Sequence, residues 1–175
     1  MRRRWIDTSV FIEAKNRYYS FDIAPQFWSF LDEMADAEKL CSSTRVYQEI
    51  LKREPAKDEL ANWAKNRRDS SMFIRPDRNV QSQVTSIADH VTTAYDQIKA
   101  AQFLDGADPW IIAHAICDKG IVVSQESRVD INSQTPKIPN VCSHFGVQCI
   151  DVFEMLKQLG FSFGNPKSKG RGQKS

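Results

Sequence analysis

Long apolar runs are missing from this sequence of 175 residues. No run approaches the ~18 apolar residues of a helix that spans a bilayer, so we expect no membrane segment. The opening Met-Arg-Arg-Arg-Trp also lacks the apolar stretch of a secretory signal. We therefore expect a cytoplasmic protein.

Cysteine and histidine are too scarce and scattered to suggest a disulfide framework or a zinc site. The four cysteines form no C-x-x-C pair and lie in or beside apolar runs: Cys41, Cys117, Cys142 and Cys149. This pattern predicts small buried side chains in a reducing compartment. His114 lies inside an apolar stretch, which predicts a core residue, whereas His90 and His144 have no matching partners.

Charge is balanced overall but unevenly placed. The net charge is +2, yet seven basic residues lie at the two ends: Arg2, Arg3, Arg4, Lys167, Lys169, Arg171 and Lys174. Without them, 17 of the 24 basic residues remain against 22 acidic ones. An acidic body suits a cation site, although basic ends can equally be solvated tails. Residues 164–175 are rich in Gly, Lys and Ser, which predicts a disordered basic tail that is dispensable for folding.

Short apolar stretches alternate with longer amphipathic ones. The short stretches predict strands at residues 4–6, 39–42, 121–123 and 147–150, with residues 72–74 ambiguous. The longer stretches predict helices, among them one that begins at Pro25 and a single long helix over residues 80–98. The alternation predicts one α/β domain over residues 1–163, a three-layer α/β/α sandwich with a mainly parallel central sheet. The crevice beyond the carboxyl ends of such strands is the usual functional site.

An acid-headed helix is predicted inside residues 103–126. Asp108 fits its N-cap and Pro109 its first helical position. The run over residues 107–116 is apolar almost all round, which predicts a buried helix. The strand at 121–123 then ends in Ser124-Gln125-Glu126, just as the first strand ends at Asp7.

Acids at strand ends and helix starts predict a site for a hard metal ion. Mg²⁺ and Mn²⁺ prefer oxygen ligands, and a divalent ion removes the repulsion between crowded carboxylates. Asp7, Asp105, Asp108 and Glu126 are the acids that this pattern brings to the crevice. A bound ion can lower the pKa of water and polarise a phosphate.

These motifs resemble those of PIN-domain nucleases. Asp7-Thr8-Ser9 follows the first strand, and Glu49 lies on an early helix. The stretch Asp-Pro-Trp-Ile-Ile-Ala-His-Ala from Asp108 is similar to the family's acid-headed D-x-x-I-A-x-A helix. Ser124-Gln125-Glu126 is similar to its T-x-D strand end, with glutamate where the family more often has aspartate. The resemblance covers about residues 4–160 and points to the compact prokaryotic branch that includes VapC-like toxins.

The resemblance implies a PIN-like fold and a metal-dependent endoribonuclease that cleaves RNA with a metal-activated water. It implies Mg²⁺ or Mn²⁺ as cofactor, held by Asp7, Glu49, Asp108 and Glu126, with Asp105 as a further ligand. Ser9 and Ser124 would orient these carboxylates through hydrogen bonds. An antitoxin protein and a second copy of the chain are the implied protein partners.

Simpler roles remain open for the same residues. Asp7 and Asp108 can act as helix caps alone, and Glu49 can be a solvated helix residue. The basic and aromatic residues 15–19 are expected to form a loop that either grips RNA through Lys15, Arg17 and Tyr18 or packs as ordinary surface. Further candidate phosphate contacts are Arg45, Lys52 and Arg128.

Two other functions compete with the nuclease. The first is a PIN-like module that binds RNA or protein without catalysis. The second is a phosphoacceptor receiver domain, which also gathers acids at strand ends. It ranks lower because the sequence shows neither a central acceptor Asp nor a Lys that ends a late strand.

Overall fold

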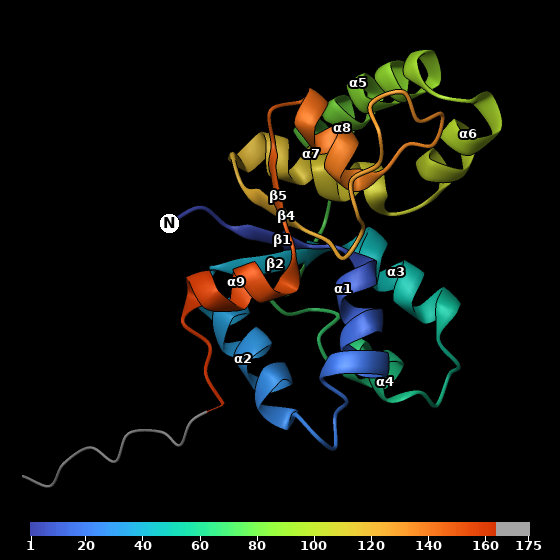
Figure 1. Ribbon diagram of the computed structural model, residues 1–175. Coiled ribbons are helices and arrows are strands. Elements are labelled where there is room, and N and C mark those ends of the chain that lie inside the picture. Colours follow the sequence, from blue (N-terminus) through green and yellow to red (C-terminus); the bar gives the residue numbers. More distant parts are fainter. Residues whose placement is uncertain (164–175) are drawn as a thin grey trace, which may run out of the picture.

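The computed structural model describes residues 1–163, and these form an α/β fold around one five-stranded sheet (Figure 1). The strand order is β3-β2-β1-β4-β5, and all four pairings are parallel. The strands are β1 (Arg4–Ile6), β2 (Leu40–Ser43), β3 (Phe73–Ile74), β4 (Ile121–Val123) and β5 (Gln148–Ile150). The expected parallel sheet is therefore confirmed, including a strand in the ambiguous stretch at 72–74.

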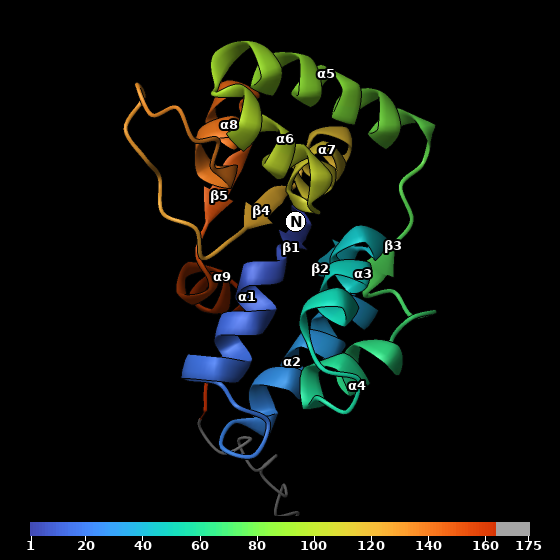
Figure 2. The ribbon, with the colours of Figure 1, turned by 90° about the vertical axis from the view of Figure 1, so that its right-hand side faces the viewer.

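Helices cover both faces of the sheet, as Figures 1 and 2 show. One layer holds α5 (Arg78–Ala94), α6 (Gln97–Asp105), α7 (Asp108–Asp118) and α8 (Ile138–His144). The other holds α1 (Thr8–Glu13), α2 (Pro25–Asp36), α3 (Thr44–Arg53), α4 (Glu59–Lys65) and α9 (Val152–Leu159). The three-layer sandwich that the sequence predicts is thus the observed architecture.

The core consists of two layers of apolar side chains, one on each face of the β-sheet. Fully buried Phe11, Phe27 and Leu31 fill the layer under the sheet, and Ile87 and Ile111 fill the layer above it. Each such side chain contributes about 1.5–3 kcal/mol when it leaves water. These two layers fix the strand ends against the helix starts, which is where the predicted site lies.

The prediction of a single helix over residues 80–98 is wrong, because the helix is interrupted at Tyr95. Tyr95 has extended backbone angles, and the Asp96 side chain accepts hydrogen bonds from the N–H groups of Ile98 and Lys99. Asp favours an N-cap over a helix interior, so Asp96 starts a second helix, α6. Ile98 is consequently 70% exposed and does not belong to the buried stripe.

Other local expectations need smaller corrections. The expected loop at residues 15–19 is instead a wide helical turn, η1 (Ala14–Tyr18), that continues α1. Cys117 is exposed, whereas Cys41 and Cys142 are buried as expected. Helix α9 ends at Leu159, and Gly160 caps it in the left-handed conformation with φ of 75°. The predicted tail over residues 164–175 lies outside the described residues.

The histidines also differ in part from expectation. His114 is a core residue that stacks on Trp5 with ring centroids 4.2 Å apart, but its Nε2 has no hydrogen-bond partner. Burial lowers its pKa to about 4, so the ring is neutral. His90 and His144 stack on each other with ring centroids 3.5 Å apart, and within residues 1–163 neither belongs to a group of three possible metal ligands.

Candidate functional site

The site begins where two neighbouring strands end. β1 and β4 are paired in parallel, with Ile6 opposite Val123. Asp7 directly follows β1, and its N–H donates to the carbonyl of Val123 at 2.9 Å. Ser124 follows β4, so its side chain reaches the same sheet edge. This register brings together two segments that are more than 100 residues apart in the sequence.

Asp7 is the most enclosed acid of the site, with 2% of its surface exposed. Its Oδ2 accepts hydrogen bonds from the Ser9 N–H at 3.2 Å, the Ser9 hydroxyl at 2.5 Å and the Ser124 hydroxyl at 3.2 Å. Its Oδ1 is buried and has no hydrogen-bond partner. Asp7 is therefore the N-cap of α1, as the simpler interpretation expected, and also holds one free carboxylate oxygen.

Ser9 and Ser124 form the hydrogen-bonded frame that the sequence predicts around this carboxylate. The Ser9 hydroxyl also accepts from the N–H of Gln125 at 3.0 Å, and the Ser124 hydroxyl accepts from the N–H of Glu126 at 3.1 Å. The two hydroxyl oxygens are 3.4 Å apart. The frame fixes which oxygen of Asp7 is engaged and which is left free.

Asp108 is not the N-cap of α7, contrary to expectation. The cap is Ala107, whose carbonyl accepts from the N–H groups of Trp110 and Ile111, and Asp108 is the first helical residue. Its carboxylate therefore has no capping role. Burial raises its pKa well above the ordinary value, and the charges of Asp7, Glu126 and Glu49 raise it further.

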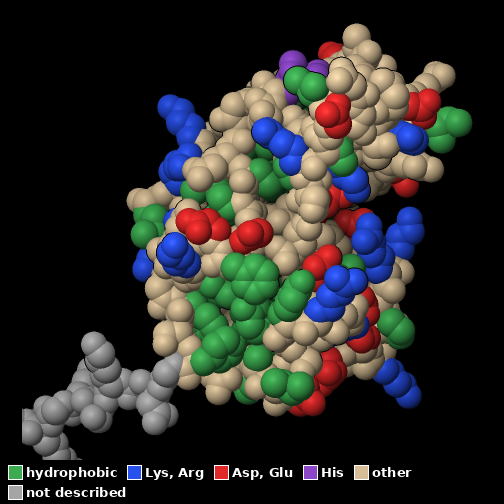
Figure 3. Space-filling model, in the orientation of Figure 1, with side chains coloured by type: hydrophobic (Ala, Val, Ile, Leu, Met, Phe, Trp, Pro, Cys, Tyr) green, Lys and Arg blue, Asp and Glu red, His purple; other side chains and the backbone are tan. Residues whose placement is uncertain are grey.

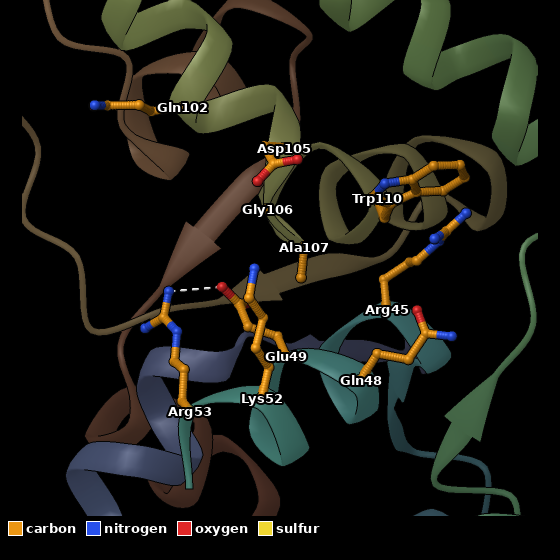
Figure 4. A pocket seen from close by; sticks show the side chains of 10 residues that line it. All are labelled: Arg45, Gln48, Glu49, Lys52, Arg53, Gln102, Asp105, Gly106, Ala107 and Trp110. Carbon is orange, nitrogen blue, oxygen red and sulfur yellow. Dashed lines mark hydrogen bonds and ion pairs between the residues drawn. The ribbon is translucent and has the colours of Figure 1, made fainter.

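Glu49 lies on α3 and is held by two donors. Its Oε2 accepts from the Thr8 hydroxyl at 2.6 Å, and its Oε1 accepts from Arg53 at 2.6 Å (Figure 4). Sequence reasoning missed both partners. Thr8 stands inside the Asp-Thr-Ser triplet, and Arg53 is four residues after Glu49, the spacing at which helical side chains meet. Glu49 is thus paired on both carboxylate oxygens, and 14% of its side chain remains exposed.

Glu126 is bound by the start of α8. Its carboxylate accepts from the ammonium of Lys137 at 3.0 Å and from the N–H of Ile138 at 2.9 Å. Lys137 was not among the expected site residues, and no sequence motif marks it. Glu126 nevertheless lies near enough to Asp7 and Asp108 for its charge to raise the pKa of both.

The four acids therefore influence one another in the folded chain. The pKa of Asp7 is raised to about 6, chiefly by burial, against the opposing hydrogen bonds of Ser9 and with the help of the Glu126 and Glu49 charges. Asp105 stands apart, since its side chain is exposed at the end of α6. The structure thus joins Asp7, Glu49, Asp108 and Glu126 electrostatically and leaves Asp105 at the margin.

As these side chains stand in residues 1–163, no three of His, Cys, Asp or Glu are grouped closely enough to hold a metal ion. Two of the acids instead point their oxygens at Arg53 and Lys137. The free Oδ1 of Asp7 and the raised pKa values of Asp7 and Asp108 are features expected of carboxylates that bind a cation. The unpartnered Oδ1 of Asp7 is a ligand oxygen that a divalent ion would satisfy, with Asp108 as the nearest further carboxylate by charge.

A groove of about 520 Å³ opens beside Glu49 between α3 and the α6–α7 turn (Figure 4). Three cations of α3, Arg45, Lys52 and Arg53, line one wall, and Trp110 lines the other. Figure 3 shows basic and acidic side chains side by side along the hollow at the right-hand edge of the molecule. The groove is a surface on which an anionic chain can reach the acids.

The remaining candidate RNA contacts lie elsewhere. The Lys15 ammonium is paired with Glu54 and Asp58, so its charge is already neutralised by the chain. Arg17 is exposed, and Tyr18 meets Phe153 edge-on at 5.3 Å. Figure 3 shows hydrophobic side chains gathered around α9 on this face. Arg128 is exposed beside the acidic strand end.

No helix in residues 1–163 is long and apolar enough to cross a membrane.

Comparison with known proteins gives one match. No curated protein matches the chain. One family model matches residues 5–163, and its description is "Domain of unknown function (DUF4411)". Because that match spans nearly the whole chain, the protein belongs to the DUF4411 family.

Proposed function

We propose that the protein is a metal-dependent endoribonuclease with a PIN-like site. The observation that carries the proposal is the buried, unpartnered Oδ1 of Asp7 beside Asp108, both with raised pKa values. A buried carboxylate oxygen without a partner is costly, so an ion that binds it is strongly favoured. Asp7, Asp108, Glu49 and Glu126 would hold Mg²⁺ or Mn²⁺, with Asp105 at the rim.

The substrate class follows from charge. A phosphodiester is repelled by crowded carboxylates unless a cation lies between them, and the groove beside the site carries Arg45, Lys52 and Arg53. When bound, the metal ion would neutralise the acids, activate a water and polarise a phosphate oxygen. The chain itself orients Asp7 through Ser9 and Ser124, and it holds Glu49 and Glu126 ready near Arg53 and Lys137.

The ion pairs of Glu49 and Glu126 favour a second candidate, a PIN-like module that binds RNA or protein without catalysis. In that case Arg53 and Lys137 replace a metal permanently. Both pairs are partly solvated, and exposed pairs contribute only about 0–1 kcal/mol. A divalent ion can displace such pairs, so we prefer the nuclease.

The decisive experiment compares the parent with Asp108→Asn on labelled single-stranded and structured RNA. Each is assayed with Mg²⁺, with Mn²⁺ and with EDTA. Asp89→Asn is the matched control, because Asp89 is an exposed residue of α5 whose carboxylate has no hydrogen bond or ion pair within residues 1–163. Metal-dependent cleavage by the parent and the control, lost in Asp108→Asn, supports the nuclease. Cleavage that survives in Asp108→Asn removes Asp108 from the site, and a parent that binds RNA but never cuts it supports the binding module.

The biological setting is part of the same proposal. From the resemblance to VapC-like toxins we propose that the protein is the toxin of a cytoplasmic toxin–antitoxin pair. Its partners would be an antitoxin protein and a second copy of the chain. Expression of the parent should then arrest growth, whereas Asp108→Asn should not. Normal growth with an active, soluble parent enzyme would rule out the toxin role without affecting the nuclease.

A further inference from the structure

The groove beside the acids has one wall built for anions. Arg45, Gln48 and Lys52 are spaced three and four residues apart on α3, so they share the face that lines the groove. Among the described residues, Lys52 has no ion-pair partner and Arg45 has no carboxylate partner. Their charges are therefore available to a ligand, unlike that of Arg53, which is held by Glu49.

The opposite wall carries an aromatic ring already covered by a cation. The Arg45 guanidinium lies over the Trp110 ring at 4.3 Å from its centroid (Figure 4). Trp110 is half-buried, whereas Trp5, Trp28 and Trp63 are buried in the core. Arg45 is exposed and lines the groove, so a flat ring can extend the stack on the guanidinium face away from Trp110.

The groove is continuous with the acidic site. Glu49 lines it, and Gly106 and Ala107 at its far wall immediately precede Asp108. An anionic chain that follows the cations of α3 is led to the buried carboxylates. The amides of Gln48 and Gln102 stand on the two sides of this path and can each donate and accept a hydrogen bond, as a ribose 2′-hydroxyl requires.

We propose that this groove binds a single-stranded RNA segment next to the bond that is cut. Arg45 and Lys52 bind its phosphates, and one unpaired base stacks on the Arg45 plane above Trp110. A base inside a duplex has no free face to offer, so single strands are preferred over duplexes. This inference rests on the proposed nuclease function for its biological meaning but concerns binding alone.

The test measures binding without cleavage. A 5′-fluorescein-labelled single-stranded RNA is titrated with protein in EDTA at several salt concentrations, and the dissociation constant is read from anisotropy. The same sequence is repeated as duplex RNA and as single-stranded DNA. The parent should bind single-stranded RNA at least several-fold more tightly than either. Equal affinity for duplex RNA, or for DNA, overturns the proposal.

Three variants separate charge from stacking. Arg45→Gln removes both and should weaken binding by about tenfold, within the range for one lost base stack. Arg45→Lys keeps the charge but lacks the plane, so affinity should fall about fivefold while the salt dependence stays that of the parent. Lys52→Gln should lower the slope of log K against log salt by about one. Lys157→Gln, at an exposed residue of α9, is the charge-matched control and should bind as the parent does.

Fluorescence of the single half-buried indole gives a second readout. The RNA should quench the parent's tryptophan emission, and Trp110→Phe should remove most of that change while leaving the melting temperature close to that of the parent. If Arg45→Gln binds RNA as tightly as Lys157→Gln, the proposed RNA-binding role of the groove is refuted, even when the parent cleaves RNA. If the groove variants lose RNA binding but no metal-dependent cleavage is found, the binding role is supported and the proposed nuclease function is refuted.

Discussion

The exchange of Asp7 for asparagine should stabilise the metal-free protein. Asn also caps helices well, and its carbonyl oxygen can accept the same bonds from Ser9 and Ser124 that Oδ2 accepts now. Its amide would then take the place of the unpartnered Oδ1, near the charges of Glu126 and Glu49. The substitution removes one buried charge from a crowd of acids without leaving a cavity.

The size of the effect follows from the pKa of Asp7. Its folded value of about 6 lies above the ordinary 3.8, so the folded state holds a proton that the unfolded chain lacks between these values. Stability is therefore full below about pH 3.8 and is lost as the pH rises through about 6. The difference between the two pKa values corresponds to about 3 kcal/mol at high pH. Roughly half of it develops between about pH 5 and about pH 8.

The assay is thermal or urea unfolding in EDTA across that pH range. Relative to the parent, Asp7→Asn should gain about 3–6 °C in melting temperature between about pH 5 and about pH 8. Asp58→Asn is the matched control, because Asp58 also caps a helix but has a pKa lowered, despite partial burial, by its bonds to Lys15 and to the N–H groups of α4. The control should lose stability near neutral pH. A parallel pH profile for parent and Asp7→Asn would refute the reasoning, because it would mean that Asp7 ionises as freely in the folded chain as in the unfolded one.

Three further substitutions test one contact at the site and two contacts that hold the fold. Arg53→Gln frees Glu49 and should tighten Mn²⁺ binding several-fold by calorimetry, with a stability change below about 1 kcal/mol because the pair is partly solvated; weaker metal binding would contradict this. Gly120→Ala should destabilise by roughly 1–3 kcal/mol in urea, since its new Cβ would lie 2.8 Å from the ring of Trp5, and an unchanged midpoint would show that the ring can yield. Lys15→Met leaves two carboxylates without their shared cation and should lower the free energy of unfolding by about 2 kcal/mol, whereas a gain in stability would mean that apolar packing outweighs the pairs.

Much of the sheet could be predicted because its three central strands, β1, β2 and β4, are buried and bounded by clear breaks. The strand at Arg4–Ile6, for example, is a short apolar stretch that ends at an acid, and its register with Ile121–Val123 aligns Asp7 with Ser124. The break at Tyr95 could not be predicted in the same way. The apolar period continues through it, and only the capping preference of Asp96 marks the new helix.

The acids of the site could be named from their positions, but their partners could not. Asp7 and Asp108 stand at element ends, where the sequence leaves a visible signal. Lys137 meets Glu126 across a loop, and this contact depends on how α8 is placed in space. Arg53 carried a readable signal, the spacing of four from Glu49 on one helix, but that spacing does not say that the pair borders the other acids.

The central place of β1 has a consequence for how the chain is made. β1 is the first strand to leave the ribosome, yet its two neighbours are β2, which begins at Leu40, and β4, which begins at Ile121. The middle of the sheet therefore stays half-open until about two thirds of the chain has been synthesised, and long-range parallel pairing of this kind is slow to form. The four acids come together only at the end of this process, since Glu126 follows the last strand to flank β1. A chain that ends before Glu126 thus carries Asp7 without its full set of acidic neighbours, and assembly of the sheet delays the appearance of the site until β4 and Glu126 have been made.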